Sequence, residues 1–352
     1  MARKDESKST PQPTSDRDFV RDALEQYEEA ESRQAELRRK AISDYRFAMI
    51  PGYQWDQHLT TKRRNRPCYE FNRVRQMIRR VTGEQLQNRP QIKLRPTEDT
   101  DRTIAEIYQG LIRNIEAISH AKLAYDYGFT WAVSAGRGAW EIKVEYESES
   151  GFDKQLKIAP ILDPYSVVFD PASRDFFRRD ARHAFRSTLI PREKFKELYP
   201  GREIVDFGSN ITSRERYWWH EKEVRIAQYW YKEPQRRTIY LLSDGSVVDA
   251  VEFDPIAREA ARQGLTIVQM RDVIIEIVKC CLISGRQRLS EVIEWPGKQI
   301  PIIINWGEYH VIDGEEYYCG MTRYGRDAQM IHNFELSTLI EVVAKMPNSP
   351  LQ

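Results

Sequence analysis

The feature that most constrains the fold is a change in the spacing of apolar residues, which occurs near residue 139 and reverses near residue 321. Before the first change, apolar residues recur every three or four positions, which is typical of helices. Between the two changes they alternate or form short runs, which is typical of strands. Helices, then a mixed β region, then one long helix predict an α+β protein, because a βαβ protein would alternate the two element types.

Three helices are expected in the first part of the chain, over residues 18–47, 69–87 and from 101 on toward 131. The first is highly charged and has few apolar residues, so we expect it to lie on a larger body with its other faces in water. The second has apolar residues at helical spacing and ends at Asn88-Arg89-Pro90, because a residue that precedes proline disfavours helical dihedral angles.

The middle of the chain predicts short strands with two short helices, at 191–198 and 254–263. The expected strands cover residues 139–147, 155–161, 166–169, 181–189, 224–232, 238–242, 247–251, 266–269, 273–283, 287–289 and 300–304. A last helix over 324–344 has an apolar stripe, and Met346-Pro347 ends it. No later sequence is present to cover this stripe, so we expect a partner chain or further sequence to do so.

Composition excludes several classes of protein. Lys and Arg number 54 and Asp and Glu 53, so the net charge is +1 and the chain is no histone-like polycation. The N-terminus lacks the apolar core of a signal peptide, and no apolar run approaches the roughly 20 residues that span a bilayer. We therefore expect a protein made in a cytoplasm with no membrane partner. Cys68, Cys280, Cys281 and Cys319 form no CxxC pair and are expected to be buried, reduced thiols.

The densest basic run lies between residues 62 and 80 and is interleaved with Tyr69 and Phe71. Basic and aromatic residues together can follow a nucleic-acid backbone. Alternatively, the arginines pair with acidic neighbours in the fold or across a subunit boundary, which the balanced total charge favours. The run comprises Lys62, Arg63, Arg64, Arg66, Arg73, Arg75, Arg79 and Arg80.

Enzyme motifs are absent from the sequence. There is no GxxxxGK[ST] phosphate loop, no HExxH and no GxSxG. Gly136-Arg137-Gly138 precedes a strand rather than a helix, so a tight turn explains it better than a phosphate site. Asp163, Asp170, Asp175 and Asp180 match no calcium-loop spacing and are expected to begin turns, and no cofactor is expected.

The segment from Glu294 to Pro347 resembles the portal proteins of short-tailed phages. The likeness rests on Ile300-Pro301, Asp313-Gly314, Gly320, Arg323, Arg326-Asp327, Gln329, Asn333, Ser337 and Glu341. Upstream it includes a helix over 72–83, the glycine turn at 136–138, the segment between two Asp-Pro pairs at 163–171 and a strand over 273–283. The likeness extends over about residues 65–350.

This resemblance implies a ring, usually of twelve subunits, at one capsid vertex of a virion, assembled in the host cytoplasm. Residues 1–17 would be a disordered leader, 18–132 the helical part of a "wing", 133–320 its β-rich part, 321–346 a "stem" helix and 347–352 the start of a "clip". The clip, a second stem helix and a crown would be missing. Implied partners are other copies of the chain, double-stranded DNA, the terminase motor, a tail adaptor, and capsid or scaffolding proteins.

Site residues follow from the same resemblance. Arg323, Arg326 and Lys345, on or beside the stem helix, are candidates to face DNA in the channel. Candidates for subunit contacts are Arg73, Arg75, Arg79, Arg80, Asp327, Asn333 and Glu341. Two other functions remain open. One is a sequence-independent nucleic-acid-binding protein that uses residues 62–80. The other is a metal-dependent nuclease that uses the carboxylates between Asp163 and Asp180.

Overall fold

The computed structural model describes residues 16–89, 91–96, 102–202, 204, 218, 222–257 and 264–346. The expected leader and the expected clip segment lie largely or wholly outside these residues. The chain divides into two compact units. Unit 1 consists of the residues up to Ala30 together with Val168–Ile300, and unit 2 of Glu31–Val167 together with the residues from Pro301 on.

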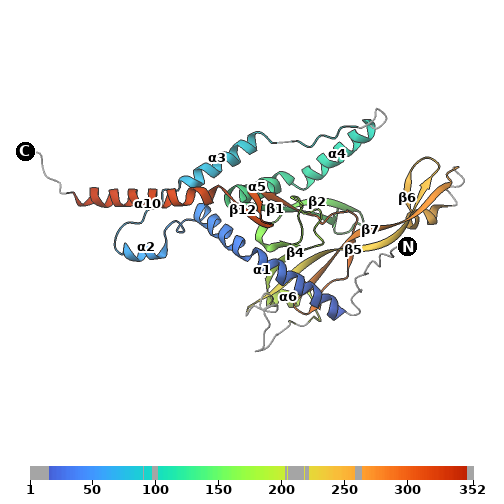
Figure 1. Ribbon diagram of the computed structural model, residues 1–352, viewed down its shortest axis with the longest axis horizontal. Helices are drawn as coiled ribbons and strands as arrows, with labels where there is room; N and C mark the ends of the chain where they lie inside the picture. The colour runs from blue at the N-terminus through green and yellow to red at the C-terminus, as the bar shows by residue number, and fades with distance from the viewer. Residues whose placement is uncertain are drawn as a thin grey trace, which may run out of the picture. The chain divides into compact units, whose positions relative to one another are not determined.

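The α+β class is confirmed, with antiparallel sheets and a long C-terminal helix (Figure 1). Short 3-10 turns are η2 (Pro164–Ser166) and η3 (Asp254–Ile256). The α-helices of the described residues are α1 (Asp16–Met49), α2 (Gln57–Lys62), α3 (Arg73–Gln87), α4 (Arg102–Ile118), α5 (Ala121–Ala135), α6 (Arg192–Leu198), α8 (Ala250–Phe253) and α10 (Met321–Lys345).

Three helix predictions need correction. The helix expected over 254–263 begins earlier, as α8, and continues as the 3-10 turn η3, while residues 258–263 lie outside those described. The helix expected from residue 69 begins only at Arg73, because the Asn72 side chain accepts a hydrogen bond from Arg75 N–H and caps the helix there. The helix expected from residue 101 toward 131 is two helices, α4 and α5. His120 separates them with a backbone φ of 49°, in the left-handed region that a continuous helix does not contain.

Unit 2 contains a three-stranded sheet and a separate hairpin. The sheet has the order β10-β1-β2 and is antiparallel throughout, and the hairpin pairs β11 with β12. Sequence reasoning identified the turn at Asp313-Gly314 but not the two strands beside it. The bounds are β1 (Arg137–Tyr146), β2 (Lys154–Pro160), β10 (Ile302–Trp306), β11 (Glu308–Ile312) and β12 (Glu315–Cys319).

Unit 1 contains a seven-stranded sheet in which β3, β4, β5, β7 and β8 are neighbours in that order, while β6 pairs with β5 and β9 with β7. Its strands are β3 (Val167–Phe169), β4 (His183–Pro191), β5 (Glu223–Leu242), β6 (Val247–Asp249), β7 (Ile267–Ser284), β8 (Gln287–Arg288) and β9 (Ile293–Trp295).

Strands β5 and β7 are each one long strand where the sequence predicted two. Pro234 lies between the two strands expected at 224–232 and 238–242, and proline cannot donate a ladder hydrogen bond. It lies beyond Tyr231, where the pairing with β4 ends, and before Ile239, where the pairing with β6 begins. Only β7 flanks β5 at this point, opposite Glu276, so no second neighbour requires the missing N–H.

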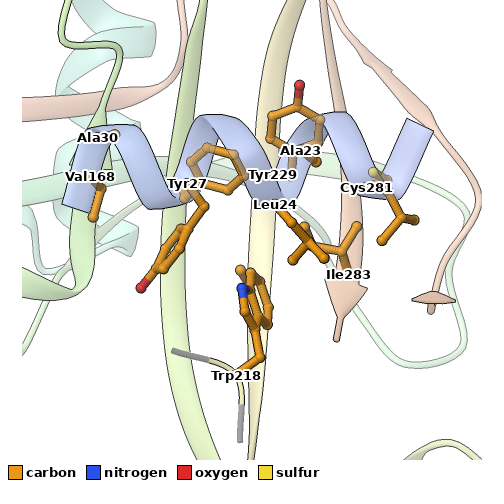
Figure 2. Packing of buried hydrophobic residues seen from close by; sticks show 12 residues of the cluster. Ala23, Leu24, Tyr27, Ala30, Val168, Trp218, Tyr229, Cys281 and Ile283 are labelled. Atoms are coloured by element: carbon orange, nitrogen blue, oxygen red, sulfur yellow. The ribbon is translucent and has the colours of Figure 1, made fainter. Parts of the chain in front are cut away.

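The core of unit 1 forms where the first half of α1 lies on the sheet (Figure 2). Val20, Ala23, Leu24, Tyr27 and Ala30 follow a spacing of three and four residues, so they share one face of the helix. They pack on strand residues and on one tryptophan. This confirms that the charged helix lies on a larger body. The residues opposite α1 are Val168, Phe185, Trp218, Ala227, Tyr229, Cys281 and Ile283.

Two clusters form the core of unit 2. In the first, Ala41 of α1, Ala135 of α5, Tyr165 and Tyr318 pack together. The second joins the end of α1 to α3 and α10 and comprises Phe47, Ala48, Val74, Ile78, Met49, Val133 and Met330. Helix α3 is therefore held by its one buried face, and its opposite face is exposed. That face is where most of the helix's arginines lie.

All four cysteines are free thiols, as expected. Cys280 and Cys281 are buried on β7, but Cys68 and Cys319 are partly exposed, so the expectation of full burial was wrong for those two. Among the described residues, no helix combines the length and apolar character that crossing a membrane requires.

Candidate functional site

Four polar residues spaced four apart form a stripe along α10, namely Gln329, Asn333, Ser337 and Glu341, which we call the polar stripe. Residues four apart lie on one face of a helix. The first three are buried, and the Glu341 side chain is 11% exposed. A buried polar side chain needs hydrogen-bond partners, because an unsatisfied one costs about 1–3 kcal/mol. The partners of this stripe lie more than 250 residues away in sequence.

Most of the backbone partners belong to residues 67–74, which run alongside α10. The stretch from residue 67 to 72 we call the extended segment. Tyr69 N–H donates to Ser337 Oγ (3.0 Å) and Phe71 N–H to Asn333 Oδ1 (2.9 Å). Gln329 Oε1 accepts from Arg73 N–H (2.8 Å) and Gln329 Nε2 donates to the carbonyl of Phe71 (3.0 Å). Alternate residues of the segment therefore bond successive residues of the stripe.

The match in spacing explains why this arrangement works. Four residues of an α-helix rise about 6 Å, and two residues of an extended chain advance about 6.6 Å. The two repeats therefore nearly coincide. A polar side chain at every fourth position of α10 can accept from the backbone N–H of every second residue of the segment. The stripe satisfies the backbone much as a neighbouring strand would, and this is why residues 69–72 are extended rather than helical.

Arg63 joins the end of α2 to the far end of the stripe. Its guanidinium donates to Thr338 Oγ1 (3.0 Å), the carbonyl of Pro67 (3.3 Å) and Glu341 Oε2 (3.4 Å). The guanidinium also lies over the rings of Phe334 and Trp55, at 4.9 and 5.7 Å from their centroids. The positive charge is thus stabilised by one carboxylate and two aromatic faces although Arg63 is buried.

The structure divides the basic run into groups with different roles. The Arg63 guanidinium and the Arg73 backbone N–H donate hydrogen bonds to side chains of α10. Ion pairs within the fold involve Arg66, 3.7 Å from Glu341, and Arg80, 3.6 Å from Glu84. The expectation that the arginines find acidic neighbours in the fold is therefore met at three positions. For the other members of the run, a role between subunits or on nucleic acid stays a prediction.

The candidates for channel-facing charge have partners within unit 2. Arg323 and Arg326 both contact the buried carboxylate of Asp44 on α1, at 2.7 and 3.0 Å, and Lys345 pairs with Glu341. Of the interface candidates, Asn333 is wholly buried, whereas Asp327, Arg79 and Arg80 are exposed. The roles assigned to these residues stay predictions. Sequence reasoning missed Asp44, which has no motif around it.

Replacing Asp44 by alanine is expected to lower the free energy of unfolding by about 3 kcal/mol, because two arginines would lose the carboxylate that neutralises them. Denaturant unfolding at pH 7 measures this. Asp327→Ala is the matched control, since it removes an exposed carboxylate of α10 and should change stability by less than about 0.5 kcal/mol. Equal effects of the two substitutions would contradict the role of Asp44.

Burial raises the pKa of Asp44 above the ordinary carboxyl value, although Arg323 and Arg326 oppose the shift. The folded chain then holds this proton more tightly than the unfolded chain. The stability that Asp44 contributes is therefore greatest below the ordinary pKa and decreases as pH rises through the folded value. Relative to Asp44→Asn, the parent chain should gain stability as pH falls from 7 toward 4.

The Gly136-Arg137-Gly138 sequence is structural. Gly136 ends α5 with a φ of 98°, and its N–H donates to the carbonyl of Ala132, which confirms the tight turn. Arg137 is buried, and its guanidinium donates to the carbonyls of Pro164 (2.6 Å) and Val167 (2.8 Å). No phosphate site forms here, because Arg137, the only cation of the motif, is buried and donates its hydrogen bonds to backbone carbonyls.

The four aspartates of the nuclease hypothesis each accept hydrogen bonds from backbone N–H groups, as turn residues do. Asp163 accepts from Tyr165, Asp170 from Ala172, Asp175 from Phe177 and Asp180 from Arg174. In the described part of the chain, no three His, Cys, Asp or Glu side chains are grouped as a metal site. The turn interpretation accounts for all four carboxylates.

Comparison with known proteins supplies the identification. The family described as "Phage P22-like portal protein" matches residues 24–352, which include α10, the polar stripe and the extended segment. The chain belongs to this portal family. The resemblance inferred from the sequence is thereby confirmed. As a portal-family protein the chain is a structural component of a phage virion and not an enzyme.

A curated relative agrees with the portal assignment. The "Portal protein" of Acyrthosiphon pisum secondary endosymbiont phage 1 is 26% identical over 335 residues, which are 90% of this chain and 46% of that protein. The chain spans about half the length of this relative. The activity and partners of a complete portal protein therefore do not follow for this chain from the match alone.

Proposed function

We propose that the chain is the subunit of a portal ring at one capsid vertex, through which phage DNA is packaged and ejected. The family match over residues 24–352 is the observation that carries this proposal. In the proposal, residues 18–132 and 133–320 form the helical and β-rich parts of a wing. Helix α10 is the first stem helix, and the clip, second stem helix and crown lie outside the 352 residues.

The surface of α10 supports an assembly. From Ile331 on, α10 exposes apolar side chains to solvent, whereas its polar stripe is buried. This is the reverse of what a solvated helix presents. A neighbouring subunit, or the part of a full-length portal that this chain lacks, would cover them. The exposed apolar residues are Ile331, Phe334, Leu339, Ile340, Val342 and Val343.

A ring requires two different patches per subunit, because a head-to-tail contact closes only when one patch meets another. The exposed arginines of α3, including Arg79 and Arg80, offer a positive patch. Acidic residues dominate the first half of α1 and offer a negative one. Other partners in the proposal are double-stranded DNA in the channel, the terminase motor, the tail adaptor and the capsid or scaffolding proteins. Assembly would take place in the host cytoplasm.

The mass of the purified chain in solution, measured by light scattering without DNA, tests the proposal. We expect a ring-sized particle of about twelve subunits, either for this chain or after the missing half is restored. Arg79→Glu with Arg80→Glu should reduce assembly, whereas Lys194→Glu with Lys196→Glu, the same charge change on exposed residues of α6, should not. A monomer that stays monomeric in the longer chain would contradict the proposal.

A further inference from the structure

The turn that follows α2 divides four basic residues between the interior and the solvent. Arg63 points inward to the polar stripe, whereas Lys62, Arg64 and Arg66 are exposed. We call these three exposed residues the basic turn. Arg66 N–H donates to the carbonyl of Arg63 (2.7 Å), and Asn65 between them has a φ of 69°. This geometry is that of a hydrogen-bonded β-turn with a left-handed residue at its third position.

Contacts of Arg63 fix the conformation of this turn. A buried arginine is costly to desolvate, and here the two terminal nitrogens of the guanidinium donate to Thr338, Glu341 and the carbonyl of Pro67. The residues on either side of Arg63 are therefore held against α10, beside which α2 lies (Figure 1). The three exposed cations extend from a rigid base, which lowers the entropy that binding a ligand would cost.

Positive charge dominates this surface. Among the described residues, Glu341 is the one carboxylate that forms ion pairs with the turn, and it is shared among Arg63, Arg66 and Lys345. Lys62 and Arg64 have no ion pair among the described residues. The nearest acidic residues in sequence are used elsewhere, because Asp56 caps α2 and Glu70 accepts from the N–H groups of Gly52 and Gln54. Five cations beside one shared carboxylate leave a local excess of positive charge.

We propose that the basic turn, with Lys345 beside it, binds the phosphate backbone of double-stranded DNA without regard to sequence. Each strand of a duplex carries a phosphate every 3.4 Å along its axis, so closely spaced cations can bind several at once. Backbone binding of this kind needs no base-reading element, and the turn offers none. The choice of DNA as the polyanion rests on the proposed portal function. The presence of an anion-binding site is argued from the exposed cations of the turn alone.

The arginines of α3 are the less suitable part of the basic run. Arg80 pairs with Glu84 one helical turn away, and Arg73 donates to Gln76. Their charges are spread along a helix of 15 residues, whereas those of the basic turn occur within five consecutive residues. The nucleic-acid hypothesis is thus narrowed from residues 62–80 to residues 62–66.

The test is binding of a labelled 20-base-pair duplex to the full 352-residue chain, followed by fluorescence anisotropy over a series of salt concentrations. The Lys62→Gln, Arg64→Gln, Arg66→Gln triple variant should bind at least about tenfold more weakly at low salt, and its log–log salt slope should fall by about 2 to 3. The control triple variant, Lys194→Gln, Lys196→Gln, Arg202→Gln, removes as many exposed charges in and beside α6 and should keep most of the affinity.

Three results would overturn the inference. The parent chain could fail to bind the duplex, or the two triple variants could lose affinity equally, which would indicate a diffuse charge effect. Alternatively, the basic-turn variant could keep its DNA affinity but change the particle mass, which would indicate an acidic protein surface as the partner. Light scattering of the same samples separates this test from the ring proposal, because DNA affinity should fall at unchanged mass.

Discussion

Replacing Gly138 by alanine is expected to prevent the stable folding of unit 2. Gly138 lies on β1 where the strand passes directly under Gly128 of α5. A Cβ on Gly138 would lie 1.8 Å from the carbonyl oxygen and 2.5 Å from the carbonyl carbon of Gly128. These are backbone atoms of a packed helix, so no side-chain rotation relieves the contact. Helix and strand would have to separate, which disrupts the core around them.

The measurement is the yield of soluble protein together with its thermal unfolding profile. Gly110→Ala is the matched control, because Gly110 lies within α4 and a Cβ there meets no atom within 4 Å. Alanine at this site should raise stability by about 0.5–1 kcal/mol, since glycine is a poor helix former. The same change thus has opposite expected signs at two glycines. A Gly138→Ala chain as stable as the parent would show that α5 and β1 are not in contact.

Local signals predicted most of the regular elements. The apolar spacing gave α1 and α6 to within two residues at each end, and the alternation of apolar residues located β1, β2 and β4. Such patterns depend on a segment and the one face it buries, so they can be read without knowing what covers that face. Asn88-Arg89-Pro90 likewise ended α3 where expected.

Errors arose where a distant segment decides the local conformation. Residues 69–72 have helical apolar spacing, yet the polar stripe of α10 bonds their backbone and holds them extended. Whether β5 continues through Pro234 depends on which strands flank it at that point, which no local pattern records. In both cases tertiary contacts outweigh a local preference worth only about 1 kcal/mol per residue.

The site was partly visible in the sequence. The resemblance singled out Gln329, Asn333, Ser337 and Glu341, and their spacing of four residues already placed them on one helical face. Polar residues at regular spacing within an otherwise apolar helix indicate a buried hydrogen-bonded face as readily as a surface. Only the structure distinguishes the two, because it shows a stretch of backbone that requires these acceptors. Asn333 in particular is buried within its own chain.

Replacing Asn333 by leucine should therefore have a large effect, lowering the free energy of unfolding by about 3–5 kcal/mol. Asn333 Oδ1 accepts from Phe71 N–H (2.9 Å) and Gln329 Nε2 (2.8 Å), and Nδ2 donates to Gln54 Oε1 (2.7 Å). Leucine has a similar size but leaves the Phe71 N–H and Gln54 Oε1 buried without partners. The loss is the desolvation of these two groups, since little cavity is created.

Denaturant unfolding and hydrogen exchange together measure this effect. Exchange at the amide of Phe71 should accelerate far more than exchange at the amides of β1, because the substitution removes Asn333 Oδ1, the acceptor of the Phe71 N–H. Glu335→Leu is the control, since it makes an exposed position of the same helix apolar and should change stability by less than about 0.5 kcal/mol. If Asn333→Leu were as stable as this control, α10 would not hold residues 67–72, and the support that the basic turn receives from α10 would also be in question.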